Sequence, residues 1–323
     1  YKVLCAAAEL ARKQHPSKRV LLSEASNFPT DLYMAQSVCK HYDLRLELTD
    51  AKDLASALNG DVAVLMLTHV NYRTGAMYDM AGVTHAAHAV GALTVWDLAP
   101  SAGAVPVDLS SANADYAVGC GYKYLNGGPG APAFVWANPR VVSATKQPLS
   151  GWWGHALPFA FDASYVPQIG IDQYLCGTQS MLAMAAMACG LDVFEQANAS
   201  GGMPTIRAKS LALTDLFMGL CEARCTAFGL INVTPTAHQM RGSHVSLATP
   251  NGGYAMIQAL IARGVVGDFR GGAATGEADL LRFGFTPLYT RFVDVWDAVE
   301  HMVCMLQANE WQRSEFNRTQ VVT

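Results

Sequence analysis

A single lysine stands where a buried strand is expected to end. The run from Tyr116 to Cys120 is short and apolar, which is typical of a buried strand, and the loop 121–130 that follows contains Lys123. Lysine is rarely buried without a partner, and loss of hydration lowers the pKa of its ammonium group toward the neutral amine. A neutral amine is a nucleophile that forms a Schiff base with an aldehyde. On this stretch alone, the pattern is equally consistent with a nucleophilic Lys123 and with a loop lysine whose ammonium group reaches water.

Asp97 supplies a carboxylate twenty-six residues before this lysine. An aspartate at the end of a buried strand most often caps a helix, and in some folds it binds a ribose. Together with Lys123 it has a more specific interpretation. Pyridoxal phosphate needs a lysine for its Schiff base and a carboxylate opposite its pyridinium nitrogen. That carboxylate keeps the nitrogen protonated, which makes the ring an electron sink. The two residues therefore indicate a pyridoxal-phosphate enzyme.

Other chemical motifs have weaker support. The sequence contains no phosphate-binding loop of the form GxxxxGK[ST], no GxGxxG after a strand and no GxSxG elbow. His85 and His88 lie three residues apart on an expected helix with no third ligand nearby, so we interpret them as helix-surface residues. Cys221 and Cys225 are the only close cysteine pair, and no second pair completes a zinc site. We therefore expect no metal.

Apolar strands alternate with helices around these residues. The pattern predicts strands at 19–23, 44–48, 62–68, 93–96, 116–120 and 133–136, and helices at 1–14, from Pro29 onward, at 51–58 and at 79–90. Such alternation is typical of a mainly parallel sheet with helices on both faces. Ligands bind outside the carboxyl ends of the strands in these sheets, and Thr68, Asp97 and Lys123 lie at or just past such ends. Three strands should therefore bring polar groups to one edge.

The pattern changes in the second half of the chain. Residues 147–178 are irregular, and a long helix is predicted at 179–198. Further helices are predicted at 205–228, 253–263 and 292–308, with short strands near 230–234, 243–248, 265–269 and 280–285. We therefore predict an α/β large domain over 1–198 and a smaller α+β domain over 199–323. The glycine-rich segment 271–277 is the expected flexible loop.

The composition excludes several classes of protein. Of the 323 residues, 51% are hydrophobic and 15% are charged, so a large core is available. The net charge of −4 gives no reason to expect nucleic acid or an anionic membrane surface as a partner. No apolar run is long enough to span a bilayer, and residues 1–5 do not form a signal peptide. The eight scattered cysteines mostly lie in apolar surroundings, which fits a reducing, cytoplasmic setting.

Six stretches resemble the motifs of the kynureninase family, especially its bacterial members, in order and in spacing over essentially the whole chain. They are Asn27-Phe28-Pro29-Thr30-Asp31, Thr68-His69-Val70-Asn71-Tyr72, Trp96-Asp97-Leu98-Ala99, Tyr122-Lys123-Tyr124-Leu125-Asn126-Gly127-Gly128-Pro129-Gly130, Gly151-Trp152-Trp153-Gly154-His155 and Arg282-Phe283-Gly284-Phe285-Thr286-Pro287-Leu288-Tyr289. The resemblance implies the pyridoxal-phosphate fold type I of aspartate aminotransferase, in a homodimer. It also implies hydrolysis of L-kynurenine, and of 3-hydroxykynurenine, to L-alanine and anthranilate or 3-hydroxyanthranilate in tryptophan breakdown.

The resemblance also assigns roles to individual positions. Lys123 is the expected Schiff-base lysine and general base, and Asp97 is the expected partner of the pyridinium nitrogen. Further cofactor contacts are expected from Phe28, which would stack on the ring, and from Pro29, Thr30, Asp31, Thr68 and Tyr122. Trp152 and Thr178 are expected to reach the cofactor of the neighbouring chain across the dimer interface. Arg282 is the expected ligand of the substrate carboxylate; without the resemblance, we would interpret it as a surface arginine on a strand edge.

Three departures from the family keep alternatives open. The family begins well before Tyr1, with a segment that supplies further phosphate and substrate contacts, so either this sequence omits the segment or the protein lacks part of the site. Pro100 occupies the position of a cofactor-contacting histidine, and the segment 271–277 is longer than usual. One alternative is a catalytically impaired relative that still binds the cofactor. Another is cysteine desulfuration on the same fold, although Cys120 and Cys176, the cysteines nearest the motifs, are both interpreted as packed residues.

Overall fold

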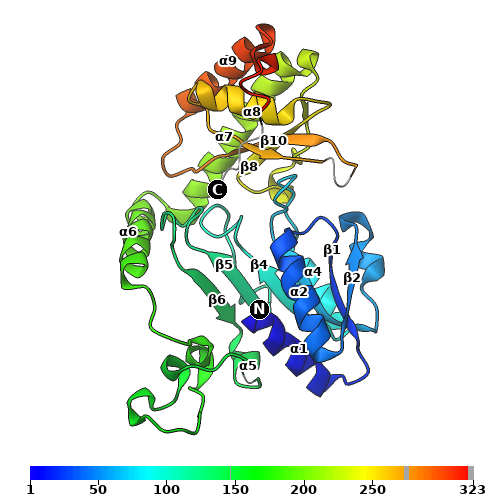
Figure 1. The fold of residues 1–323 in the computed structure, drawn as a ribbon, viewed down its shortest axis with the longest axis vertical. Helices are drawn as coiled ribbons and strands as arrows, with labels where there is room; N and C mark the ends of the chain where they lie inside the picture. The colour runs from blue at the N-terminus through cyan, green and yellow to red at the C-terminus, as the bar shows by residue number, and fades with distance from the viewer. Residues whose placement is uncertain (146, 273–275, 319–323) are drawn as a thin grey trace. The chain divides into compact units, whose positions relative to one another are not determined.

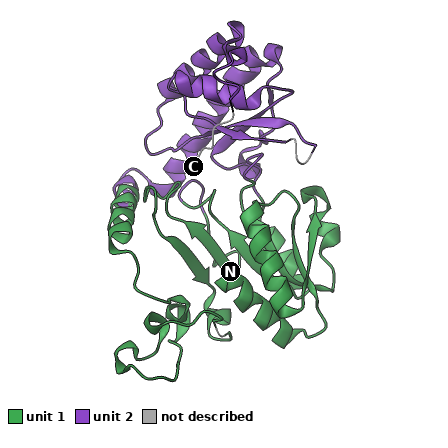
Figure 2. Ribbon diagram, viewed as in Figure 1, with its two compact units in different colours: residues 1–71, 78–102, 107–194 green, residues 72–77, 103–106, 195–323 purple. Residues whose placement is uncertain are grey.

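The computed structural model describes residues 1–145, 147–272 and 276–318. The chain divides into two units (Figure 2). Unit 1 comprises residues 1–71, 78–102 and 107–194, and unit 2 comprises residues 72–77, 103–106 and 195–323. Two short segments from the first half of the sequence thus belong to unit 2. The domain division at residues 198 and 199 stays a prediction.

Unit 1 is built on a six-stranded sheet (Figure 1). Its strands are β1 (Val20–Glu24), β2 (Arg45–Thr49), β3 (Val62–Thr68), β4 (Leu93–Asp97), β5 (Tyr116–Cys120) and β6 (Ala133–Ala137). Their order is β2-β1-β3-β4-β5-β6; β1 to β5 run parallel, and β6 is antiparallel to β5. Every residue of β3 is buried, as its continuous apolar sequence requires. The mainly parallel sheet predicted from the sequence is confirmed.

Helices cover both faces of this sheet (Figure 1). The helices in this part of the chain are α1 (Lys2–Gln14), α2 (Pro29–Tyr42), α3 (Leu54–Ala57), α4 (Met80–Ala89), α5 (Pro139–Val142) and α6 (Met181–Asn198), of which α6 lies beside the sheet (Figure 1). Val64 and Met66 share a core with α1 and α2, whereas the alternate residues Leu65 and Leu67 share one with α4. This alternation follows from the two-residue period of a strand. The predicted helix at 51–58 is shorter, because residues 51–53 form a 3-10 turn before α3.

The strand order reverses between β1 and β3. The chain leaves β1 to form β2 on one side, then returns to add β3 and β4 on the other. Loops that follow β1 and β3 therefore diverge at the carboxyl edge of the sheet, where ligands bind in this class of fold. Asn27 and Phe28 follow β1, and Thr68 ends β3.

Helix α6 packs against the lysine loop through Gly190 and through Met187, whose sulfur lies close to Gly121 and Gly127. Of α6, all of which the structure describes, Gly190 alone is buried. A Cβ atom at this position would lie 2.7 Å from the carbonyl carbon of Asn126 and 2.8 Å from the carbonyl oxygen of Leu125. Any larger residue would therefore displace the backbone that follows Lys123. Among the residues that the structure describes, no helix is long and apolar enough to cross a membrane.

Unit 2 contains a four-stranded antiparallel sheet and three long helices. The strands, in the order β7-β8-β10-β9, are β7 (Ile231–Asn232), β8 (His244–Thr249), β10 (Asp279–Gly284) and β9 (Asp268–Arg270). The helices are α7 (Gly202–Cys225), α8 (Gly253–Ala262) and α9 (Phe292–Gln307), which enclose one apolar core with the sheet. The mixture of short strands and helices agrees with the α+β class predicted for this part. Residues 273–275 of the expected flexible loop lie outside the described residues.

Replacement of Gly190 by alanine tests the contact between α6 and the lysine loop. Because the added Cβ would overlap the Asn126 backbone, we expect Gly190→Ala to lower the free energy of unfolding by about 1–3 kcal/mol. Gly219→Ala is the matched control, since a Cβ there meets nothing within 4 Å inside α7. That change should raise stability by about 0.5–1 kcal/mol. Urea unfolding of both variants is the measurement, and equal stabilities would contradict the packing argument.

Candidate active site

Two polar residues end neighbouring strands side by side at the carboxyl edge of unit 1. Thr68 is the last residue of β3 and is paired in register with Asp97, the last residue of β4. The Asp97 carboxylate accepts a hydrogen bond from the Ala99 N–H through Oδ1 at 2.8 Å. Its backbone carbonyl accepts another from the His69 N–H at 2.9 Å. These contacts fix the direction of the carboxylate before any ligand is considered.

Asn27 connects the loop after β1 to Thr68. Its side chain is buried; Oδ1 accepts hydrogen bonds from the Thr68 hydroxyl and from the Phe28 N–H, the latter at 2.7 Å. Its Nδ2 donates to Ser23 Oγ at 3.0 Å. Asn27 belongs to one of the motif stretches, but the sequence indicated no role for it. An amide two residues before a proline that starts a helix was the available signal, since asparagine often bonds local backbone N–H groups.

The carboxylate of Asp31, in the first turn of α2, completes this cluster. Its Oδ2 lies 3.4 Å from Thr68 Oγ1. Burial, followed by the charge of Asp97, raises the pKa of Asp31 to about 7. Burial also raises the pKa of Asp97, against the opposing effects of the Ala99 N–H and the Lys123 charge. Two carboxylates confined together disfavour double ionisation, so this edge of the sheet favours a proton or a cationic group between them.

Lys123 is exposed, and its role as the Schiff-base lysine stays a prediction. Strand β5 ends at Cys120, and hydrogen bonds from Gly121 N to Pro132 O and from Gly127 N to Gly121 O, both 2.9 Å, close a loop that carries the lysine outward. Its Nζ lies 5.7 Å from the centroid of the Tyr122 ring. The charge of Lys123 nevertheless acts on the Asp97 carboxylate. The loop therefore brings the amine to the carboxylate cluster while leaving it in water.

The other predicted contacts near α2 and β5 lie around this cluster. Phe28 precedes α2 and is 40% exposed, and Pro29 is the first helical residue, as expected. Thr30 is exposed in the same turn. The pKa of Tyr122 is raised by burial and then by the neighbouring Cys120 and Asp97. The structure thus gathers these residues at one edge of unit 1.

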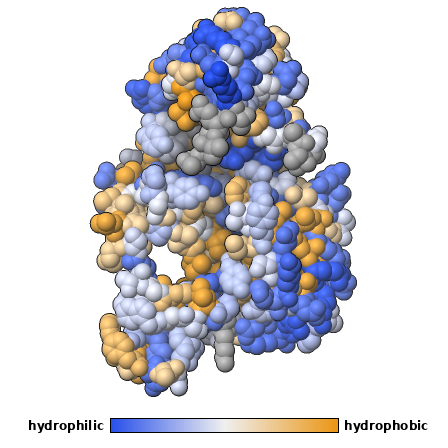
Figure 3. Space-filling model, viewed as in Figure 1, coloured by the Kyte–Doolittle hydropathy of each residue, from blue (hydrophilic) through white to orange (hydrophobic). Residues whose placement is uncertain are grey.

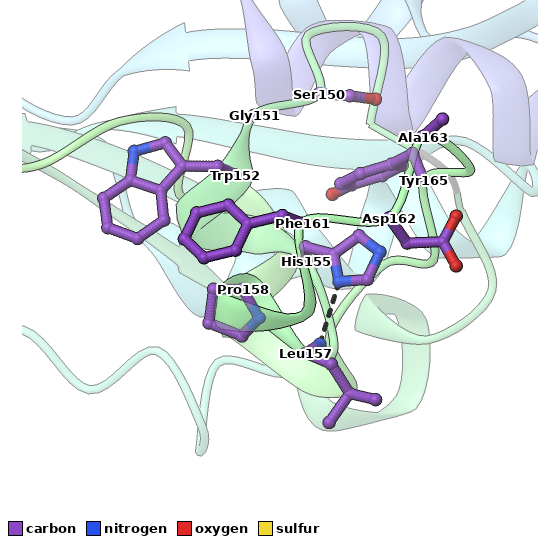
Figure 4. Close-up of a pocket in the computed structure, with 10 residues that line it drawn as sticks. All are labelled: Ser150, Gly151, Trp152, His155, Leu157, Pro158, Phe161, Asp162, Ala163 and Tyr165. Carbon is purple, nitrogen blue, oxygen red and sulfur yellow. Dashed lines mark hydrogen bonds between the residues drawn. The ribbon is translucent and has the colours of Figure 1, made fainter.

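Trp152 and Thr178 are not part of this cluster. Trp152 belongs to a 3-10 turn (Trp152–Gly154), and its ring packs 4.6 Å from that of Trp153 and 5.7 Å from that of Phe159. It lines a separate pocket of about 410 Å³ with His155 and Tyr165 (Figure 4). Figure 1 shows this segment beyond the carboxyl end of the antiparallel strand β6, at the opposite end of the sheet from the lysine loop. Thr178 is exposed in the segment before α6.

Arg282 lies in the interior of the unit 2 sheet, so its interpretation as a strand-edge residue is wrong. It belongs to β10, which pairs with β8 on one side and β9 on the other. Its Nη1 donates to the carbonyl oxygen of Tyr72 at 2.8 Å, and Nη2 forms an ion pair with Asp268. The side chain is 22% exposed. Sequence reasoning missed Asp268, because its proximity to Arg282 arises from strand pairing.

Several secondary predictions are corrected by the structure. His85 is exposed as expected, but His88 Nε2 lies 2.8 Å from the buried Asp115 carboxylate, so His88 is not a simple surface residue. The cysteines, all free thiols, are buried at Cys5, Cys39, Cys221 and Cys225, yet Cys189 and Cys304 are exposed. Among the described residues, no group of three or more His, Cys, Asp or Glu side chains could hold a metal ion.

Comparison with known proteins identifies the family. Residues 4–253 match the aminotransferase class-V family, and residues 206–302 match the kynureninase C-terminal domain. A kynureninase from Burkholderia mallei is 54% identical over 327 residues, which cover 100% of this chain and 76% of that protein. The chain belongs to the kynureninase family. A kynureninase from Pseudomonas fluorescens is 52% identical over the same shares of both chains.

Solved structures share the fold of this kynureninase-family chain at lower identity. A cysteine desulfurase from Thermococcus onnurineus has a TM-score of 0.76 at 16% identity, over 94% of this chain and 77% of that chain. A cysteine desulfurase from Escherichia coli also has a TM-score of 0.76, at 18% identity, over 95% of this chain and 76% of that chain. The predicted pyridoxal-phosphate fold type I is therefore confirmed.

The carboxylate pair predicts a pH-dependent stability of the cofactor-free protein. The pKa of Asp31 is about 7 in the fold and 3.8 as its ordinary value, so the native state binds more protons than the unfolded state between these values. Stability from this group is therefore present at low pH and lost as the pH rises through about 7. We expect Asp31→Asn to flatten this decline in urea unfolding measured from pH 5 to pH 8. Asp53→Asn, at an exposed carboxylate of unit 1, is the control; equal pH profiles for both variants would contradict the assignment.

Proposed function

We propose that this chain is a kynureninase that hydrolyses L-kynurenine, and 3-hydroxykynurenine, to L-alanine and anthranilate or 3-hydroxyanthranilate, with pyridoxal 5'-phosphate as its cofactor. The observation that carries the proposal is 54% identity to a kynureninase over the whole chain. The reaction would belong to tryptophan catabolism by the kynurenine pathway, which leads toward NAD biosynthesis. Free thiols at all eight cysteines support a cytoplasmic location.

The residues at the edge of unit 1 fit this cofactor. A protonated ring nitrogen would stabilise the ionised form of Asp97, which burial disfavours, and would offset the charge of Asp97 that raises the pKa of Asp31. The exposed ring of Phe28 would stack on the cofactor ring, while the Thr68 and Tyr122 hydroxyls would supply polar contacts. Pro29 and Thr30 would contribute from the same turn. When bound, pyridoxal phosphate supplies an electron sink that stabilises negative charge on substrate carbon atoms.

The protein groups then have distinct tasks. The Lys123 amine would hold the cofactor and would serve as the general base for the proton on the substrate Cα. Asp97 would hold the ring nitrogen in its protonated form. Arg282, with a planar guanidinium group, would bind the substrate carboxylate through two N–H donors.

Exposed apolar surface supports a homodimer with shared sites. In α6, Met181 is 71% and Leu182 is 87% exposed, and in the segment before it Phe161 is 83% and Ile169 is 89% exposed. Figure 3 shows hydrophobic residues on the surface over α6 and over the segment below it in that view. Large apolar side chains exposed in this way are typical of protein interfaces. We propose that Trp152 and Thr178 reach the cofactor site of the partner subunit from this region.

The alternative functions have less support. Similarity to cysteine desulfurases is below 20% identity and concerns the fold alone. Cys120 and Cys176 are half-buried and point their thiols at the carbonyl oxygens of Ala99 and Leu149, at 3.9 and 3.3 Å. A catalytically impaired relative would bind pyridoxal phosphate and form no anthranilate from kynurenine. Cofactor absorption followed by anthranilate fluorescence separates these possibilities.

Replacement of Lys123 tests the central assignment. We expect Lys123→Ala to lose the covalent link to pyridoxal phosphate that borohydride reduction makes permanent, and to lower turnover by at least about 10²–10⁴-fold, because both the bond and the proton transfer need the amine. Lys40→Ala, at an exposed lysine of α2, is the control and should behave as the unchanged chain. Peptide mapping that located the reduced cofactor on another lysine would refute the assignment.

Hybrid dimers test the shared site. Inactive Lys123→Ala chains are mixed with chains that carry inactivating changes at both Trp152 and Thr178. One of the two sites in each hybrid would contain only intact residues, so activity should return to about one quarter to one half of the unchanged enzyme, as expected for closed two-fold dimers. Full activity in a species that sediments as a monomer would rule the arrangement out.

A further inference from the structure

One carboxylate of unit 2 forms ion pairs with two arginines. Asp268 on β9 is paired in register with Arg282 on β10. Its Oδ2 accepts the ion pair from Arg282 Nη2, and it also accepts Arg270 Nη2 at 2.5 Å. Two positive charges and one negative charge leave this trio with a net charge of +1. The trio can therefore accept one further anion without excess negative charge.

Tyr72 contacts both arginines of this trio. Its carbonyl oxygen accepts Arg282 Nη1 at 2.8 Å, and its aromatic ring lies 5.6 Å from the guanidinium carbon of Arg270. Both arginines that bind Asp268 thus also contact the same tyrosine. In the chain, Tyr72 follows Thr68 of the cofactor-edge cluster by four residues.

These contacts determine the plane of the Arg282 guanidinium group. Its two terminal nitrogens are each anchored, Nη1 on the Tyr72 carbonyl and Nη2 on Asp268. A planar group held at both ends cannot rotate about its long axis, and a two-pronged contact with a carboxylate depends on that plane. Removal of Asp268 would free one end and leave Arg270 and Arg282 to repel each other.

We propose that Asp268, with Arg270 and Tyr72, is a positioning residue that orients Arg282 for the α-carboxylate of an amino acid. This inference deepens the proposed function, on which it rests for the role of Arg282. Asp268 is 43% exposed, and an ion pair of partly exposed groups adds little to folding stability. Its main effect is therefore on ligand binding.

Alanine binding by the holoenzyme tests the inference without requiring kynurenine turnover. The dissociation constant of L-alanine is measured from the change in cofactor absorption. We expect Asp268→Asn, which keeps an acceptor oxygen but loses the charge, to weaken binding by about tenfold, and Asp268→Ala by about tenfold to a hundredfold. In kynurenine hydrolysis, KM should rise by similar factors while kcat changes less than about threefold. Asp294→Asn, which breaks the exposed pair with Arg291, is the matched control.

A double variant tests whether Asp268 acts through Arg282. Arg282→Lys keeps the charge but loses the fork, and we expect Asp268→Asn to add less than about twofold to its effect. Independent, multiplicative effects would overturn the inference, as would alanine binding unchanged in the Asp268 variants or undetectable in the unchanged holoenzyme. Failure of the proposed function has a different signature, because the unchanged holoenzyme would then bind L-alanine yet release no anthranilate.

Discussion

The repulsion between two carboxylates organises the edge of unit 1. Asp97 ends a buried strand and Asp31 begins a helix, and the reversal of strand order between β1 and β3 brings both beside Thr68. Burial and the charge of Asp97 raise the pKa of Asp31, whereas burial is what raises the pKa of Asp97. Two neighbouring carboxylates with raised pKa values would be stabilised in their ionised form by a cationic ring nitrogen. The same pair destabilises the cofactor-free fold at neutral pH, so cofactor binding and folding are expected to be linked.

Asn27 and the lysine loop position further side chains at that edge of unit 1. Asn27 joins the loop after β1 to the Thr68 hydroxyl, which couples the start of α2 to the end of β3. The lysine loop is closed by its own backbone hydrogen bonds and packs against Gly190 of α6, where no side chain would fit. Lys123 thus occupies a defined position while its amine remains in water.

The charged cluster of unit 2 has the opposite sign from the carboxylate cluster of unit 1. In unit 2, a single carboxylate lies between two guanidinium groups, so the local excess is positive. Excess negative charge at one edge suits a cationic ring, and excess positive charge around Arg282 suits the carboxylate of an amino acid. The segment from Thr68 to Tyr72 contributes a hydroxyl to the first cluster and a carbonyl to the second.

The sequence by itself determined the elements and the identity of the central residues. Apolar periodicity is a local property, so the strands, the long helices and the positions of Thr68, Asp97 and Lys123 at strand ends followed from it. Motif resemblance added Arg282. Only the tertiary structure decided the pairing of Thr68 with Asp97, the closeness of Asp31 to Asp97, the exposure of Lys123 and the ion pair of Asp268 with Arg282. Strand register and loop direction depend on contacts between residues far apart in the chain, and no local pattern encodes them.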